Sequence, residues 1–237
     1  AYLRAQTVDA SQRAAESYAR IIEEQTSRTL QAIDQRLQLA AAQLGRAYLS
    51  GNLDLASAKT LLHEQIQSLP FVESMWVLDA SGYVLYASED VTEDADQSDQ
   101  DYFRTHRDHP RTGFYLSRPV RSKAPGGWLM RASIALPDGP GGTPQGVIVA
   151  AVRPVYFDQL WRSINLGPDS VIAMLRRDGV PMMHSPFNDH DISSSHEALV
   201  NISAMQGQSQ HPHFEYTDLD DQVSRDYTYR ALSTNPE

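Results

Sequence analysis

The sequence predicts an α+β fold, in which a long N-terminal helix is followed by two tandem modules built on antiparallel sheets. The first 69 residues contain no proline and only two glycines, whereas short apolar runs separated by turns begin after residue 70. Residues 74–88 (SMWVLDASGYVLYAS) and 171–185 (VIAMLRRDGVPMMHS) share an apolar run, a turn with glycine, and a second run that closes on serine. Because a repeated pattern indicates a repeated structural unit, we expect two similar modules, each opening on a β-hairpin.

The N-terminal segment, residues 1–69, has the periodicity of a long helix. Apolar or small residues recur with a 4-3-4-3-4-3 spacing at Thr26, Leu30, Ile33, Leu37, Ala40, Leu44 and Ala47. This spacing predicts one helix from about residue 3 to 48, and a second helix is expected over residues 55–68 with Asp54 as its N-cap. The long helix is either a packed surface helix or a signalling stalk that also forms a homodimer contact along residues 3–48.

The first sheet module is expected over residues 70–164. Its predicted strands cover 73–79, 83–87, 113–120, 128–136 and 146–152, and its short helices cover 102–107 and 156–164. An acidic loop, residues 89–101, follows the first hairpin. The uninterrupted apolar run GVIVAAV indicates a strand that is buried on both faces. In the strand before it, Arg131 and Trp128 fall on opposite faces, because side chains alternate along a strand.

The second module is expected over residues 165–237. It has the hairpin at 171–185, a possible short helix at 196–205, and two strands at 213–217 and 222–232. A counterpart of the strand 146–152 is missing, and a sheet without its last strand leaves an open edge. We therefore expect this module to be truncated in the given sequence.

Composition excludes several classes of function. The formal net charge of −10 at pH 7, without a run of Lys and Arg, argues against a nucleic-acid-binding protein. The absence of cysteine excludes disulfides and thiolate chemistry. No apolar stretch reaches the roughly 20 residues that a membrane-spanning helix needs, so any membrane anchor is expected outside this segment.

Metal-binding and catalytic patterns are weak. An EF-hand loop that started at Asp94 would need glycine at position 99 and glutamate at 105, where the sequence has Asp99 and Thr105. Histidines recur in close pairs, at 106 and 109 and at 211 and 213, but the sequence places no third zinc ligand beside either pair. No nucleophile elbow, phosphate-binding loop, HExxH motif or dinucleotide fingerprint is present. We therefore expect no metal, no cofactor and no catalysis in this segment.

The order of these elements resembles the extracytoplasmic Cache family, whose modules are also described as PAS-like PDC domains. The resemblance is carried by residues 76–88, by Asp101-Tyr102-Phe103-Arg104, and by residues 115–119, 128–136 and 146–152. The linker 163–179 (SINLGPDSVIAMLRRDG) is similar to the junction between the two modules of double Cache sensors. The resemblance covers nearly the whole chain, from about residue 3 to 232, and implies that both sheet modules are PAS-like.

The resemblance implies a function as well as a fold. In this family the N-terminal helix rises from a membrane helix, and the membrane-distal module usually holds a small ligand. The full protein is usually a histidine kinase, a diguanylate cyclase or a chemoreceptor. We therefore expect a non-catalytic periplasmic sensor domain of an inner-membrane protein, with the distal module at residues 70–164 and the proximal module at 165–237.

One departure from the family concerns the ligand. The amino-acid sensors of the family carry an arginine just before a Trp-Tyr pair, and an aspartate on the last strand that holds the ligand amine. Here Gln100 and Asp101 precede Tyr102-Phe103, and the last strand offers Ala150 and Ala151. The resemblance therefore favours a small carboxylate over an amino acid.

A ligand site of this kind needs mostly apolar walls and a few convergent polar groups. We expect it between the sheet and the segment that crosses it, with arginine suited to bind a carboxylate through two parallel hydrogen bonds. The candidate residues are Trp76, Tyr102, Arg104, His106, Tyr115, Ser117, Trp128, Met130, Arg131 and Ser133. The alternative is a structural or protein-interaction module of the same fold, in which these side chains fill a core without a ligand.

Overall fold

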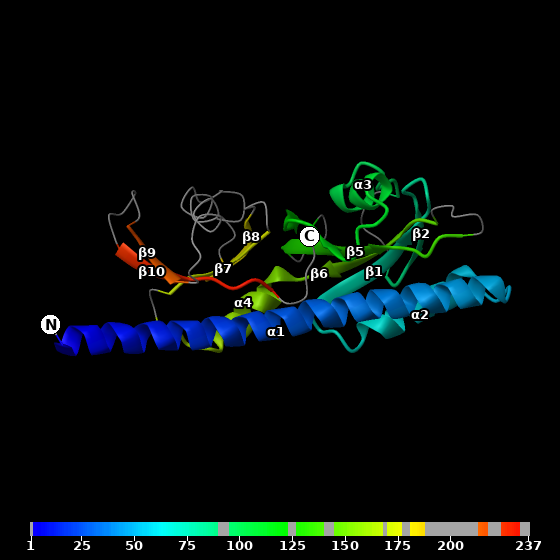
Figure 1. Cartoon of the computed structure of the whole chain (residues 1–237). Helices are drawn as coiled ribbons and strands as arrows, with labels where there is room; N and C mark the ends of the chain where they lie inside the picture. The colour runs from blue at the N-terminus through cyan, green and yellow to red at the C-terminus, as the bar shows by residue number, and fades with distance from the viewer. Residues whose placement is uncertain are drawn as a thin grey trace. The chain divides into compact units, whose positions relative to one another are not determined.

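The computed structural model describes residues 2–89, 95–122, 127–139, 145–167, 170–176, 181–187, 213–217 and 224–232. Its helices are α1 (Tyr2–Leu49), α2 (Leu55–Ile66), α3 (Asp101–Asp108) and α4 (Pro154–Arg162), as drawn in Figure 1. Among the described residues, no helix combines the length and the apolar composition that crossing a bilayer requires. The expected α+β fold with a long N-terminal helix is confirmed.

Residue contacts divide the chain into two compact units. Unit 1 comprises Ala1–Thr29 and Phe157–Thr234, and unit 2 comprises Leu30–Tyr156 and Asn235–Glu237. The predicted seam of α1 is buried in both: Thr26 belongs to unit 1, whereas Leu30, Ile33 and Leu37 belong to unit 2. The helical spacing read from the sequence therefore marks the buried side of this helix.

Unit 2 is built on a six-stranded antiparallel sheet. The strand order is β2-β1-β6-β5-β3. The sixth strand, β4, lies off this path and also pairs with β5. The strands are β1 (Val72–Leu78), β2 (Val84–Ala87), β3 (Tyr115–Leu116), β4 (Val120–Arg121), β5 (Trp128–Ala135) and β6 (Val147–Val152). Every residue of β6 is buried, because this strand lies in the middle of the sheet. The prediction from the apolar run GVIVAAV is confirmed.

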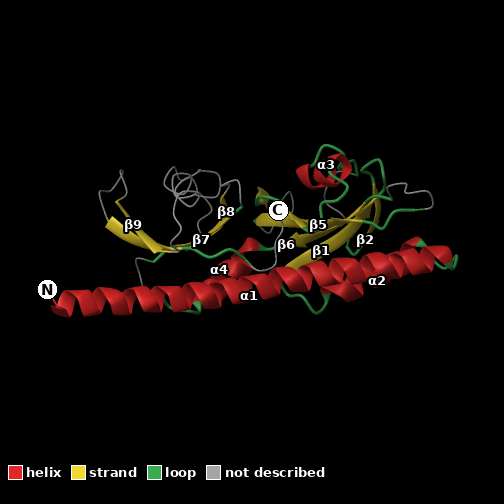
Figure 2. Ribbon diagram, in the orientation of Figure 1, coloured by secondary structure: helices red, strands yellow, loops and turns green. Residues whose placement is uncertain are grey.

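The two faces of this sheet are covered by different helices. Figure 2 shows α3 over one face, while α2 and the part of α1 in unit 2 lie along the other. The helix α2 begins at a capping box, in which the Asp54 side chain accepts from the Ser57 backbone N–H and the Ser57 hydroxyl approaches the Asp54 N–H. The predicted N-cap is confirmed, and this cap fixes where the chain turns back from α1.

Unit 1 contains two hairpins among its described residues. β7 (Ile172–Leu175) pairs with β8 (Pro181–Ser185), and β9 (His213–Thr217) pairs with β10 (Ser224–Thr228). In the same unit, the Trp161 indole N–H of α4 donates to Thr26 Oγ1 on α1 at 2.9 Å. The second copy of the hairpin pattern thus forms a hairpin, as predicted. The expected helix at 196–205 lies outside the described residues.

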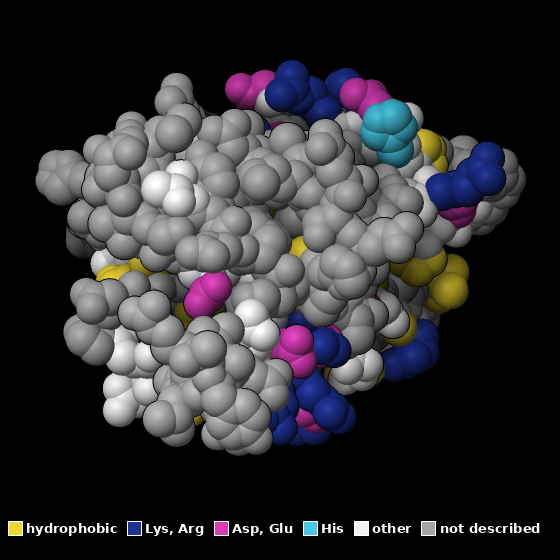
Figure 3. Space-filling view, turned by 60° about the vertical axis from the view of Figure 1, so that its left-hand side comes forward, with side chains coloured by type: hydrophobic (Ala, Val, Ile, Leu, Met, Phe, Trp, Pro, Cys, Tyr) yellow, Lys and Arg dark blue, Asp and Glu magenta, His cyan; other side chains and the backbone are white. Residues whose placement is uncertain are grey.

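The described surface carries charges of both signs. On the face shown in Figure 3, Lys and Arg side chains are interspersed with Asp and Glu side chains. The described residues of that face therefore form no single-signed basic surface.

Candidate functional site

The candidate site lies where α3 covers the sheet of unit 2. Strand register places Tyr115 opposite Ser133, Ser133 opposite Val149, and Val149 opposite Trp76. These four residues form one row across β3, β5, β6 and β1, and side chains in one row point to the same face. Tyr102 and Phe103 of α3 share a buried core cluster with Trp76 and Tyr115, so this is the face that α3 covers.

Helical spacing decides which side chains of α3 reach the sheet. Tyr102, Phe103 and His106 are buried, whereas Arg104 and Arg107 are exposed. Residues four apart lie on one side of a helix, which puts Tyr102 and His106 together and turns Arg104 toward solvent. The structure therefore does not bring Arg104 to the other candidates.

Six of the ten predicted residues come together. They are Trp76, Tyr102, His106, Tyr115, Arg131 and Ser133, here called the α3 cluster. The Arg131 guanidinium carbon lies 5.6 Å from the centre of the Trp76 ring, and the Trp76 and Tyr102 ring centres are 6.4 Å apart in an edge-on arrangement. Arg131 is 5% exposed, so a cation is held against aromatic walls beneath α3.

A second group of contacts in the α3 cluster surrounds His106. Its Nε2 lies 3.0 Å from the Ser133 hydroxyl, and its ring meets the Tyr115 ring edge-on with centres 6.4 Å apart. The Tyr115 hydroxyl donates to Asp101 Oδ2 at 3.1 Å. Burial lowers the pKa of His106 below its ordinary value of 6.5, and the nearby backbone of Ser133 and Thr112 opposes this shift only in part. The imidazole is therefore neutral at pH 7.

Two polar atoms of the α3 cluster are buried without a partner. Trp76 is 3% exposed and His106 is 4% exposed. Within the described part of the chain, neither Trp76 Nε1 nor His106 Nδ1 makes a hydrogen bond, although the Thr112 backbone is close enough to act on the histidine pKa. Buried polar groups in native proteins are nearly always hydrogen-bonded to protein, water or ligand. Two such atoms in one cluster point to an additional partner at this place.

Three other candidates lie elsewhere or are already engaged. Met130 and Trp128 alternate with Arg131 along β5 and so point to the opposite face, where the Arg121 guanidinium carbon lies 5.3 Å from the Trp128 ring centre. The Ser117 hydroxyl accepts from the Arg131 backbone N–H at 2.8 Å and donates to the Arg118 carbonyl at 2.9 Å. Ser117 thus joins the backbones of neighbouring strands.

Two polar residues of this site were not among the sequence candidates. Gln97 is buried, and its Oε1 accepts from the Tyr102 hydroxyl at 2.7 Å. Asp101 begins α3, where its Oδ1 accepts from the Tyr102 N–H and its Oδ2 accepts from Tyr115. The signal for Asp101 was its place before a helix, since a carboxylate is favoured there. Nothing in the sequence separates Gln97 from its polar neighbours.

The geometry supplies no complete catalytic or metal-binding set in the described residues. Ser133 and His106 have the contact of a nucleophile and a base, but His106 Nδ1 lacks the orienting carboxylate that such a pair requires. The described part of the chain holds no group of three or more His, Cys, Asp or Glu residues arranged for a metal ion. The α3 cluster is suited to binding rather than to bond breaking.

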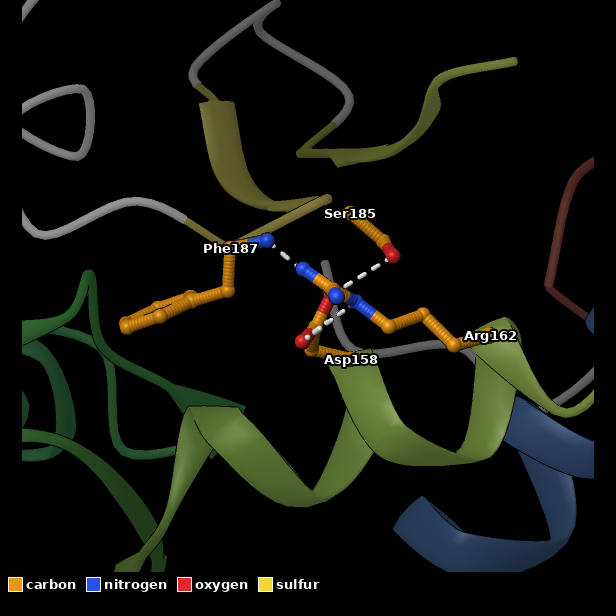
Figure 4. Close-up of polar contacts among 4 residues, drawn as sticks. All are labelled: Asp158, Arg162, Ser185 and Phe187. Carbon is orange, nitrogen blue, oxygen red and sulfur yellow. Dashed lines mark hydrogen bonds and ion pairs between the residues drawn. The ribbon is translucent and has the colours of Figure 1, made fainter. Parts of the chain in front are cut away.

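Unit 1 contains a contrasting polar cluster around Asp158 of α4. As Figure 4 shows, this carboxylate faces Ser185, Phe187 and Arg162. It accepts from the Ser185 hydroxyl at 2.6 Å, from the Phe187 N–H at 3.0 Å and from Arg162 Nε at 3.0 Å. Every polar group in this cluster has a partner within it, so the cluster fastens the end of β8 to α4.

Comparison with known proteins identifies the fold. No protein-family profile and no curated protein sequence matches the chain. The extracellular domain of rpHK1S-Z16, a candidate histidine kinase, is similar with a TM-score of 0.79 and 23% identity, over 97% of this chain and 92% of that one. The chain has the fold of an extracellular sensor domain.

Two chemoreceptor domains have the same fold. The ligand-binding domain of the Campylobacter jejuni chemoreceptor Tlp3, in complex with L-valine, has a TM-score of 0.68 and 10% identity over 95% of this chain and 90% of its own. That of the Pseudomonas aeruginosa amino acid chemoreceptor PctC, in complex with GABA, has a TM-score of 0.65 and 12% identity over 94% of each chain. The Cache-like architecture that the order of elements suggested is confirmed.

Proposed function

We propose that the chain is the periplasmic sensor domain of a membrane signalling protein, such as a histidine kinase or a diguanylate cyclase, and that it binds a small carboxylate at the α3 cluster. The fold supports the sensor role, because the similar structures are the extracellular domain of a candidate histidine kinase and the ligand-binding domains of chemoreceptors. Membrane anchors and the output domain would lie outside this sequence. The α3 cluster falls within residues 70–164, which we propose as the distal, ligand-binding module.

The observation that carries the carboxylate proposal is the buried Arg131. Its guanidinium lies against the Trp76 ring on the face of the sheet that α3 covers, and it shares a row with Ala151. The last strand thus has Ala151 where the family resemblance leads one to expect the aspartate that holds an amine. A guanidinium presents two parallel donors to a carboxylate, and this pairing is strong away from water.

Ligand binding would act on α3 first. The eight residues of α3 contact the sheet through Tyr102, Phe103 and His106, and no side chain caps its N-terminus at Gln100. A ligand that enters beneath α3 would favour a state in which this helix is displaced. The resulting shift is limited by the difference in the ligand's affinity for the two states.

A non-binding module of the same fold is the second candidate. The observation in its favour is tight packing: Tyr102 is 1% exposed and its hydroxyl is already paired with Gln97. The unpaired Trp76 Nε1 and His106 Nδ1 favour the sensor instead, because burying a polar atom without a partner costs free energy that a bound ligand would recover.

We also propose a homodimer along α1, on the pattern of a signalling stalk. Tyr18 and Ile21 are exposed on its N-terminal half. Light scattering of the purified domain would test this proposal, and a strictly monomeric mass at high concentration would contradict it.

A thermal-shift screen followed by calorimetric titration tests the carboxylate proposal. The panel contains small mono- and dicarboxylates, the corresponding amino acids, and amines. A carboxylate present at 100 times its dissociation constant should stabilise the protein by about 2.7 kcal/mol. We expect Arg131→Gln to abolish this gain, and Arg131→Lys, which keeps the charge but loses the planar fork, to weaken it.

Arg104→Gln is the matched control, because this arginine lies in the same module but faces solvent. It should bind the carboxylate like the wild type. Circular dichroism would establish that each variant is folded. Failure of all carboxylates to bind, or binding that persists in Arg131→Gln, would overturn the proposal.

A further inference from the structure

The inference concerns the part of the ligand that meets His106, and it rests on the proposed function. His106 joins α3 to β5, because its Nε2 lies 3.0 Å from the Ser133 hydroxyl. Its other nitrogen, Nδ1, is buried and makes no hydrogen bond with the described residues. The imidazole is therefore held by Ser133 on one side, while Nδ1 makes no hydrogen bond although the Thr112 backbone lies close to the ring.

The hydrogen-bonding character of Nδ1 is not fixed by its surroundings. A neutral imidazole carries one N–H donor and one bare acceptor nitrogen. The Ser133 hydroxyl can either donate to Nε2 or accept from it, so both tautomers keep this contact. In one tautomer Nδ1 accepts a hydrogen bond, and in the other it donates one. Nδ1 can therefore pair with a group that donates, with one that accepts, or with one that does both.

We infer that His106 is a specificity-determining residue that recognises a hydroxyl group on the ligand, so that the site takes hydroxycarboxylates. A hydroxyl both donates and accepts, and it satisfies Nδ1 in either tautomer. An ammonium group would find Ala150 and Ala151 on the last strand instead of a carboxylate, and a C–H group leaves Nδ1 buried without a partner. Loss of a buried partner costs more than a simple exchange of hydrogen bonds, which is why such a site discriminates strongly.

The placement of the polar groups suits a short ligand. Arg131 and Ser133 are two residues apart on β5, on the same face, which sets them about 7 Å apart along the strand. Trp76 lies in the same row as Ser133 and contributes its unpaired indole N–H. A carboxylate held by Arg131, with Trp76 as an additional donor, would leave a hydroxyl one or two carbons away facing His106.

Two matched series of compounds test this inference by calorimetric titration of the whole domain. The first is lactate, propionate and alanine, and the second is malate, succinate and aspartate. Within each series the carbon skeleton is constant, and a hydroxyl is replaced by hydrogen or by an ammonium group. We expect the hydroxyl compound of at least one series to bind tenfold or more tighter than both of its relatives.

Two variants separate recognition from a structural role. The side-chain amide of Gln can occupy the place of Nε2 and keep the contact with Ser133, whereas that of Asn lies near the place of Nδ1. His106→Gln should therefore lose the preference for the hydroxyl while still binding the deoxy compound, and His106→Asn should retain part of the preference. Arg104→Gln should leave it unchanged.

The outcomes distinguish this inference from the proposed function. Equal binding of hydroxyl and deoxy compounds overturns the role of His106 and leaves the carboxylate sensor standing, as does retention of the full preference in His106→Gln. Tighter binding of the amino compound also overturns it. Failure of both series to bind overturns the proposed function, and the inference with it.

Discussion

The Asp158 cluster of unit 1 and the α3 cluster of unit 2 bury polar side chains in opposite ways. In unit 1 the Asp158 carboxylate is 6% exposed and accepts hydrogen bonds from a hydroxyl, a backbone N–H and a guanidinium. In unit 2 Trp76 and His106 are at least as deeply buried, yet each has a nitrogen without a partner among the described residues. Charge alone would suggest Asp158 as the functional group, whereas the accounting of hydrogen bonds suggests the α3 cluster.

The difference shows that burial alone does not separate a structural polar group from a binding one. What separates them is whether all hydrogen bonds of the buried group are already made within the protein. A buried group whose hydrogen bonds are all made has none left for a ligand, and removing it leaves its partners buried without a hydrogen bond. A buried group that lacks a hydrogen bond lowers the stability of the free protein, and a ligand that supplies the missing bond restores that stability. Substitutions in the Asp158 cluster should therefore lower stability and leave ligand binding unchanged. Substitution of the unpaired groups of the α3 cluster should mainly weaken ligand binding.

The largest expected effect is on Asp158. Asp158→Ala leaves the Ser185 hydroxyl and the Phe187 N–H without their acceptor, and should lower the free energy of unfolding of unit 1 by about 3 kcal/mol. Asp158→Asn keeps one acceptor oxygen and should cost about half as much. Urea denaturation measures both variants. Glu24→Ala is the control, because Glu24 pairs with Arg28 on the exposed side of α1 and should change stability by less than about 0.5 kcal/mol.

A result near zero for Asp158→Ala would break the comparison, because it would show that the saturated cluster is as dispensable as a surface pair. Ligand titration sharpens the contrast further. A carboxylate that binds the α3 cluster should keep its affinity in any Asp158 variant that still folds.

A smaller effect is expected at Tyr102, which places a paired hydroxyl inside the α3 cluster. Tyr102→Phe removes the bond to Gln97 Oε1 and should cost about 1 kcal/mol in the ligand-free protein. Tyr48→Phe is the matched control, since Tyr48 is 70% exposed. Equal stabilities of the two variants by urea denaturation would mean that pairing in this cluster contributes nothing to the fold.

The sequence predicted the strands of unit 2 better than the site. Alternation along β5 separated Arg131 from Trp128 and Met130, and the structure has them on opposite faces as expected. Alternation cannot tell which face α3 will cover, because that depends on a contact between distant parts of the chain. Helical spacing within 102–107 excludes Arg104 from the stripe of Tyr102 and His106, so this part of the site follows from the sequence pattern.

The sequence had no means of predicting the Asp158 cluster. Asp158 lies 27 residues before Ser185 and 29 before Phe187, so no local spacing relates them. The pattern at 171–185 ended on a serine, which suggested a repeat but not a partner for its hydroxyl. Pairing across such separations is decided by the packing of α4 against β8, which periodicity does not report.

The smallest expected effect is a dependence of stability on pH that arises from the buried His106. Since burial lowers its pKa in the folded state, the unfolded chain binds a proton first as the pH falls below about 6.5. The free energy of unfolding must then decrease with falling pH, by at most about 0.7 kcal/mol between pH 7 and 6 from this one group.

Urea denaturation of the wild type and of His106→Gln at both pH values isolates the His106 contribution, because the other titrating groups are common to both proteins. The variant should lose less stability than the wild type on acidification. Arg104→Gln is the matched control, since Arg104 is exposed on the same helix, and it should retain the wild-type dependence. If His106→Gln does not reduce the dependence, His106 is already protonated or solvated in the folded state. Its Nδ1 would then not be the unsatisfied atom on which the contrast with Asp158 rests.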